Sequence, residues 1–167
     1  MLILGLDPGT ATTGYGIVEV AAGTDPRAVD YGVILTPAKT PLPERLLMLH
    51  TRLSDLLRRY QPQSAAVEKL FFQRNVTTAM SVGQARGVIL LTLAQHGLEI
   101  GEYTPNEIKE TVTGYGSAGK SQMQRMVQML LHLERIPKPD DAADALAVAL
   151  CHAQHHRWQT RLAGGRP

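Results

Sequence analysis

Cysteine is almost absent from this sequence. The single residue, Cys151, lies in an apolar, alanine-rich stretch, so no disulfide can form within the chain, which is usual in a reducing cytoplasm.

Long apolar runs are lacking as well. The N-terminal residues MLILGLDPGT contain no basic segment, and their apolar run is too short for a signal peptide or a membrane span. We therefore expect a cytoplasmic protein that makes no contact with a membrane.

A strong net charge is also lacking. The formal charge is +2, which by itself argues only weakly for a nucleic-acid partner. The distribution is more informative, because Asp144 is the last acidic residue and is followed by Arg157, Arg161 and Arg166. This basic end can contact phosphates or form a solvated tail, and both interpretations stay open.

The size and hydrophobic content indicate one folded domain. The chain has 167 residues, of which 44% are hydrophobic, enough for a single full-sized core. The sequence contains no internal repeat and no linker long enough to divide it. We expect a single domain over 1–156 and a flexible basic tail over 157–167.

Hydrophobic periodicity predicts an α/β fold in which three strands precede alternating helices and strands. A capping box, Thr104 to Glu107 with Pro105 at the first helical position, begins one of the helices. Short links between the first three strands favour an antiparallel meander, so we expect a mixed five-stranded sheet flanked by helices on both faces. The predicted strands are 2–7, 14–20, 28–35, 64–68 and 98–103, and the predicted helices are 42–60, 75–96, one after Thr104, 120–134 and 140–156.

Four carboxylates stand where a soluble core would not place them. Asp7 and Glu68 each end an apolar strand, and Asp141 and Asp144 lie three apart at a helix start, on one face. Taken singly, they are explained by a turn, a solvated strand end and helix capping. Taken together, they predict a cleft for hard cations such as Mg²⁺ or Mn²⁺. Two ions in such a cleft can activate water against a phosphodiester.

Five short segments carry a specific resemblance. They occur in the order GLDPGTATTGYG, VEKLFF, VGQARG, GYGSAGKSQ and DDAADALAVALCH, and over residues 2–156 the chain resembles the RuvC family of Holliday-junction resolvases. The resemblance implies a ribonuclease-H-like fold, a homodimer, four-way junction DNA as substrate and cooperation with the RuvA–RuvB branch-migration complex. It implies two Mg²⁺ or Mn²⁺ ions per active site and paired symmetric nicks in homologous recombination and DNA repair.

The resemblance carries the catalytic and metal-binding roles to Asp7, Glu68, Asp141 and Asp144. Asp140 is adjacent to Asp141 and could compete for the same role. The Asp-Ala-Ala-Asp-Ala-Leu spacing favours Asp141 and leaves Asp140 as the helix cap.

The homodimer needs an interface. Two nicks on symmetry-related strands require two carboxylate sets, which a two-fold pair of chains provides. The helix predicted over 75–96 has one charged residue, Arg86, and so must be buried around most of its girth, in a core or between subunits. It is our candidate interface, with Gly83 and Gly87 allowing close approach.

The residues from Gly114 to Ser121 match the phosphate-binding pattern G-x-x-x-x-G-K-[ST]. That pattern binds nucleotide only between a buried strand and a helix, whereas the preceding segment is polar and capped as a helix. We therefore expect no nucleotide. Lys120 in this loop, and Lys109 before it, are suited to holding a DNA phosphate. The resemblance supports that role for both, the alternative being ordinary surface charge.

Aromatic residues make up only 5% of the chain, and its two phenylalanines are adjacent, Phe71 and Phe72. Neighbouring side chains tend to point in opposite directions, so one is expected to pack and one to be exposed. An exposed ring beside a cleavage site can stack on an unpaired base. The resemblance favours Phe71 as this DNA wedge, and the alternative is that both rings anchor the long helix.

Three other functions stay open at this stage. One is a ribonuclease-H-like nuclease that cuts RNA–DNA hybrids or flaps. Another is an actin-like or sugar-kinase-like ATPase, although such proteins resemble two fused copies of this fold and 167 residues leave room for one. The last is a non-catalytic DNA scaffold, which would not require all four acids.

Overall fold

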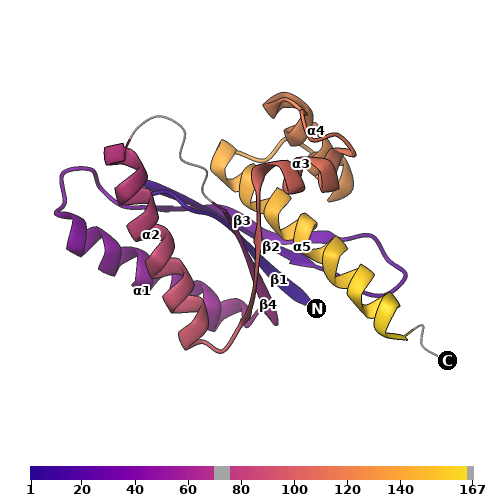
Figure 1. The fold of residues 1–167 in the computed structure, drawn as a ribbon, viewed down its shortest axis with the longest axis horizontal. Helices are drawn as coiled ribbons and strands as arrows, with labels where there is room; N and C mark the ends of the chain where they lie inside the picture. Colours follow the sequence, from indigo (N-terminus) through magenta and orange to yellow (C-terminus); the bar gives the residue numbers. More distant parts are fainter. Residues whose placement is uncertain (70–75, 165–167) are drawn as a thin grey trace.

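The computed structural model describes residues 1–69 and 76–164, and within them the chain forms a five-stranded sheet between helices (Figure 1). Across the sheet the order is β3-β2-β1-β4-β5. The first three strands pair antiparallel, whereas β4 pairs parallel with both β1 and β5. The predicted mixed sheet with its meander is confirmed. The strands are β1 (Leu2–Asp7), β2 (Thr12–Glu19), β3 (Arg27–Leu35), β4 (Ser64–Glu68) and β5 (Glu99–Tyr103).

Helices lie on both sides of the sheet, as predicted, and the element order along the chain is also the predicted one. On one side are α1 (Leu42–Tyr60) and α2 (Val76–Gln95). On the other are α3 (Pro105–Thr113), α4 (Lys120–Leu130) and α5 (Asp140–Gly164) (Figure 1). Among the described residues, no helix is long and apolar enough to cross a membrane.

Alternation along β1 divides the core into two layers, because successive side chains of a strand point to opposite faces. Leu4 and Leu6 are buried with Ile89 in the layer under α1 and α2. Ile3 is buried with Leu146 in the layer under α5. The central strand is therefore covered on both faces, and its C-terminal end is held in a defined place.

Gly5 lets α5 lie directly on the sheet. A side chain at this position would place its Cβ 2.2 Å from the carbonyl oxygen of Ala145 and 2.5 Å from the amide nitrogen of Ala149. These are backbone atoms, which cannot move aside cheaply. The helix and the central strand therefore meet backbone to backbone, and the position of α5 over the sheet is tightly constrained at Ala145 and Ala149.

Two helix ends differ from their predicted positions. The helix expected over 120–134 ends at Leu130, because His132 has a left-handed φ of 52° and the Leu133 amide bonds back to the Gln128 carbonyl at 2.9 Å. The last helix, expected over 140–156, continues to Gly164 as α5. The reason is that no glycine or proline interrupts the chain from Asp140 until Gly164.

In the single chain, α2 is buried on one side only. Ala85, Ile89 and Leu93 are buried against the sheet and α1, whereas Met80 and Leu91 are 64% and 58% exposed. The single chain therefore provides only the core-facing part of the burial that the sequence predicts, and the outer side would have to be covered by a second subunit.

Candidate active site

Two strand ends bring the first two acids together. Strands β1 and β4 run parallel and adjacent, with Leu6 paired to Val67. The residues that follow this pair are Asp7 and Glu68, so both carboxylates lie at the same edge of the sheet. The start of α5 lies over this edge and adds Asp144, and these three acids line one cleft of about 330 Å³.

The acids are buried and crowded. Burial, and after it the negative charges of Glu68, Asp144 and Asp141, together raise the pKa of Asp7 to about 8. Burial also raises the pKa of Glu68 and of Asp144, while Lys109 opposes the shift at Glu68 and Lys120 opposes it at Asp144. Three hard oxygen donors that repel one another are suited to a divalent cation, which would relieve the repulsion.

Asp141 has a different position from the other three acids. Its charge acts on Asp7, but its side chain does not line the cleft. Its main chain packs on β2, where a Cβ added at Gly14 would lie 2.0 Å from the Asp141 carbonyl oxygen. In the described part of the chain, no three Asp, Glu, His or Cys side chains already form a metal-binding group.

Asp140 is not the simple helix cap that the sequence indicated. It is the first residue of α5, and its carboxylate accepts hydrogen bonds from side chains. The donors are Lys138 Nζ at 2.8 Å, Gln124 Nε2 at 3.0 Å and Lys120 Nζ at 3.0 Å. Hydrogen bonds from Lys138, Lys120 and Gln124, in that order, hold the pKa of Asp140 well below its usual range. The reason for the difference is tertiary, because α4 brings Lys120 and Gln124 beside the start of α5.

Both predicted DNA-contacting lysines line the same cleft as the acids. Lys109 comes from α3, and Lys120 is the first residue of α4. These lysines are far from Asp7 and Glu68 in the sequence, and the packing of α3 and α4 against α5 brings them to the same cleft. The loop between these helices follows α3, whose C-cap is Gly114. The preceding strand that a nucleotide-binding loop requires is therefore absent at this position.

Two residues of this region were not identified from the sequence. Arg86 of α2 donates from Nε to the main-chain oxygen of Glu68 at 3.4 Å, and its guanidinium also pairs with Glu102. Gln124 binds Asp140, as described above. The signal for Arg86 was its isolation, since a lone charge in an apolar helix usually has a buried partner, whereas nothing distinguishes Gln124 in the sequence. Phe71, the predicted DNA wedge, and Phe72 lie outside the described residues.

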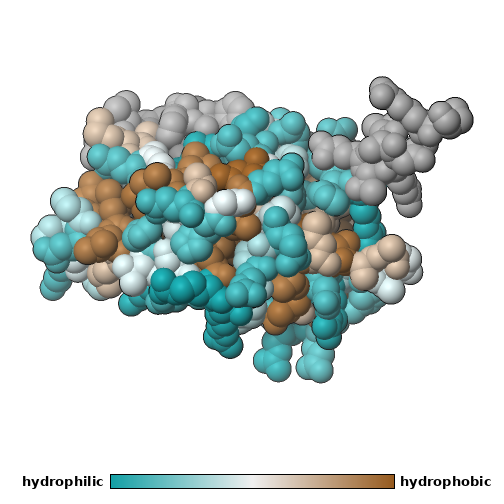
Figure 2. All heavy atoms as spheres, turned by 90° about the horizontal axis from the view of Figure 1, so that it is seen from below, coloured by the Kyte–Doolittle hydropathy of each residue, from teal (hydrophilic) through white to brown (hydrophobic). Residues whose placement is uncertain are grey.

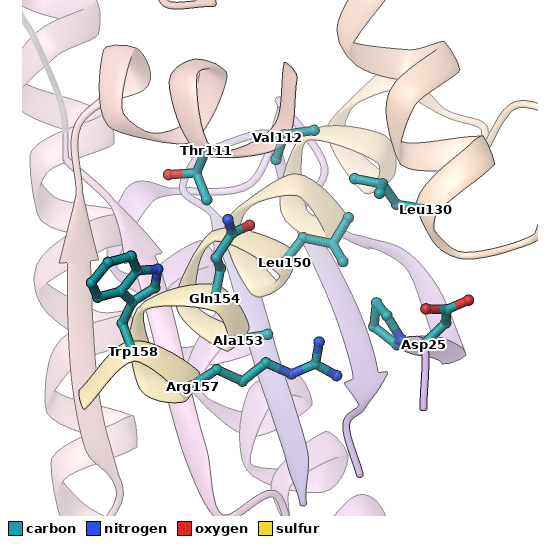
Figure 3. Close-up of a pocket in the computed structure, with 10 residues that line it drawn as sticks. Asp25, Thr111, Val112, Leu130, Leu150, Ala153, Gln154, Arg157 and Trp158 are labelled. Atoms are coloured by element: carbon teal, nitrogen blue, oxygen red, sulfur yellow. The ribbon is translucent and has the colours of Figure 1, made fainter. Parts of the chain in front are cut away.

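A second hollow, of about 310 Å³, lies farther along α5 between α3 and the loop from β2 to β3 (Figure 3). Its floor is apolar and includes Val112, Leu130 and Leu150. The carboxylate among its described lining residues is Asp25, opposite Arg157. It therefore does not share the chemistry of the cleft around Asp7.

This sheet order, with acids at the ends of β1 and β4 facing an acid on the last helix, defines the class of ribonuclease-H-like nucleases. Within that class, a family model described as crossover junction endodeoxyribonuclease RuvC matches residues 3–152. The chain belongs to the RuvC family. The predicted family, fold class and enzyme class are thereby confirmed, and an ATPase is not favoured.

Sequence relatives and a solved structure match this chain over nearly its full length. The chain is 56% identical over 164 residues to crossover junction endodeoxyribonuclease RuvC of Desulfitobacterium hafniense strain DCB-2, covering 98% of this chain and 99% of the relative. The relative of the same description from Chloroflexus aggregans is 57% identical over 153 residues, 92% of this chain and 93% of its own. A solved structure of Thermus thermophilus RuvC in complex with Holliday junction substrate has a TM-score of 0.90 at 36% identity, covering 96% and 97% of the two chains.

Proposed function

We propose that this chain resolves four-way DNA junctions by paired nicks, as a homodimer with one carboxylate cleft in each protomer. The observation that carries the proposal is the convergence of Asp7, Glu68 and Asp144 from three different elements in one cleft with two lysines. Carboxylates alone would repel a DNA phosphate. Lys109 and Lys120 at the same cleft supply the positive charge that holds it.

Nucleases of this family depend on a divalent metal ion. Asp7, Glu68 and Asp144, with Asp141 on the adjoining turn, would hold Mg²⁺ or Mn²⁺, and we propose two ions per site. When bound, such ions activate the attacking water and stabilise the leaving oxygen. The chain's own part is positioning. The parallel pair β1 and β4 fixes two of the acids, α5 fixes the others, and the lysines orient the phosphate.

The direct test is cleavage of a synthetic four-way junction in Mg²⁺, with chelator as the blank. A linear duplex of the same sequence and an RNA–DNA hybrid serve as competing substrates. We expect symmetric nicks in the junction and little cutting of the others. Preferential cutting of the hybrid would instead support the alternative nuclease function.

The homodimer rests on the outer side of α2. Met80, Gln84, Gly87 and Leu91 are all exposed and repeat at the spacing of one helix face. A Cβ added at Gly87 would meet nothing within 4 Å in the single chain, so the position is open for a partner helix. Seen from below the view of Figure 1, the molecule carries a broken band of hydrophobic residues (Figure 2). Such a surface is typical of a subunit interface.

Leu91→Asp should convert the homodimer to a monomer, because it would bury an unpaired negative charge in the apolar contact. Light scattering coupled to gel filtration measures the change in mass. The matched control is Met129→Asp, since Met129 is 66% exposed on α4, on the opposite side of the sheet. A dimer that persists in Leu91→Asp, or a parent that is monomeric while it cleaves, would contradict this interface.

Lys120→Ala should weaken junction binding by about tenfold, roughly the loss of one charge-assisted contact to phosphate. The slope of binding against salt should fall by about one unit, because one phosphate contact is lost. Binding titrations at several salt concentrations measure both effects. ATP turnover that Lys120→Ala abolishes would overturn the rejection of the nucleotide-binding loop.

Three further expectations stay predictions. They are the role of Phe71 as a DNA wedge, cooperation with the RuvA–RuvB complex and a cytoplasmic location.

A further inference from the structure

Lys120 lies between two carboxylates that have different partners. Its Nζ is 3.0 Å from Asp140 Oδ2 and 3.9 Å from Asp144 Oδ2. Asp144 lines the cleft, whereas Asp140 stands at its margin and is also bound by Lys138 and Gln124. The ammonium thus makes its closer contact with the acid outside the cleft.

This arrangement bears on cation binding in the cleft. An ammonium and a divalent cation compete for the same carboxylate oxygen, because each neutralises it. The lysine side chain is long and flexible and carries a compact charge. If Asp140 were removed, Asp144 would be the acid remaining within 4 Å of Lys120 Nζ among the described residues, and the ammonium could close the present gap of 3.9 Å.

Asp140 is itself held in place. Gln124 Nε2 binds its Oδ1 from α4, and Lys138 Nζ binds the same oxygen from the segment before α5. The other oxygen, Oδ2, is left to Lys120. The two oxygens therefore have separate tasks, one fixing the carboxylate and the other holding the lysine.

We propose that Asp140 is a positioning residue that holds the Lys120 ammonium at the margin of the cleft and so leaves Asp144 available to a divalent cation. The inference rests on the proposed function in one respect, namely that Asp144 binds the metal. Asp140 acts through Lys120 and touches neither metal nor substrate.

Two simpler roles for Asp140 give different expectations. A through-space attraction between its negative charge and the metal would operate whether or not Lys120 is present. A purely structural link between α4 and α5 would likewise not require the lysine charge. Only a role through Lys120 makes the effect of losing Asp140 depend on that residue, and a double-mutant cycle measures this dependence.

The experiment is Mn²⁺ binding to the DNA-free protein, followed by electron paramagnetic resonance of the unbound ion. In the parent background, Asp140→Ala should weaken Mn²⁺ binding by about fivefold, the size expected for one partly exposed ion pair. In the Lys120→Ala background, the same change should cost less than about twofold. Equal losses in the two backgrounds would overturn the proposal. Asp140→Asn, which keeps the side-chain volume, should give the same difference in Mn²⁺ binding between the two backgrounds. It replaces the alanine variant in the test if that variant does not fold.

Two controls complete the design. Lys138→Ala removes a cation that binds the same carboxylate but does not line the cleft. Because Gln124 still binds Oδ1 of Asp140, this change should not weaken Mn²⁺ binding. A loss as large as that of Asp140→Ala would count against the specific role of Lys120. Asp144→Asn should weaken Mn²⁺ binding in every background. Binding unaffected by Asp144→Asn would overturn the proposed metal site and this inference with it, whereas equal Asp140 effects beside a sensitive Asp144 would overturn this inference alone.

Discussion

Asp7→Asn should reduce junction cleavage by more than about a hundredfold, the scale seen when one preorganised polar group is lost from an active site, and should leave metal-free junction binding intact. The substitution removes an anionic metal ligand but keeps the shape of the side chain. Lys109 and Lys120, the proposed phosphate contacts, come from other elements than Asp7, so binding and cleavage should separate.

The structure adds a pH dependence to the binding part of this prediction. Burial and the neighbouring acids raise the pKa of Asp7 to about 8, so at pH 7 and without metal the parent side chain is mostly neutral, like asparagine. Affinities of parent and variant should then be similar. Above pH 8 the parent carboxylate becomes charged and repels the phosphate, and the variant should bind more tightly.

The measurement is junction binding in chelator at pH 7 and pH 9, beside cleavage in Mg²⁺. Glu68→Gln, Asp141→Asn and Asp144→Asn should also lose cleavage and keep binding. The matched control is Asp55→Asn, at an exposed acid of α1 that pairs with Arg58. Full cleavage by Asp7→Asn would end the proposed mechanism.

Among substitutions near the site that add a single methyl group, Gly14→Ala should be the most damaging to cleavage. The new Cβ would lie 2.0 Å from the Asp141 carbonyl oxygen and 2.6 Å from its carbonyl carbon. These are backbone atoms of the first turn of α5, so the helix start must shift. Gly14 is also the cross-strand partner of Asp7, and the shift therefore changes the distance between Asp7 and the acids of α5.

We expect Gly14→Ala to lower cleavage by about a hundredfold, since a misplacement of about 1 Å has that effect on positioned catalytic groups. The free energy of unfolding should fall by about 1–3 kcal/mol, as for other overpacked positions. Cleavage assays and denaturant unfolding test the two parts. Gly116→Ala is the matched control, because a Cβ there would meet nothing within 4 Å. Parent-like cleavage by Gly14→Ala would show that the first turn of α5 need not be held so closely.

Much of the fold follows from local patterns. The alternation in β1 and the helical period of α1 arise from side chains close together in the chain, so the elements were predictable in type and order. Helix ends were less predictable. Leu130 ends α4 because the chain turns at His132, and no local residue type required that turn.

The exposed side of α2 shows another limit. Its composition indicates a helix that is largely buried, but composition does not show whether the protomer's own core or a partner subunit buries it. The positions of the sheet and α1 decide that Ile89 is covered within the chain and Leu91 is not.

By itself, the sequence determined the family and the order of the elements. It also singled out four acids as candidates, because they stand at strand ends and a helix start, and these positions are local. Only the tertiary structure decided that Lys109 and Lys120 share a cleft with Asp7, and that Asp140 binds Lys120. These contacts join residues from different elements. Their distances depend on how closely α3 and α4 pack on α5 and α5 packs on the sheet, and glycines such as Gly14 permit the contact of α5 with the sheet.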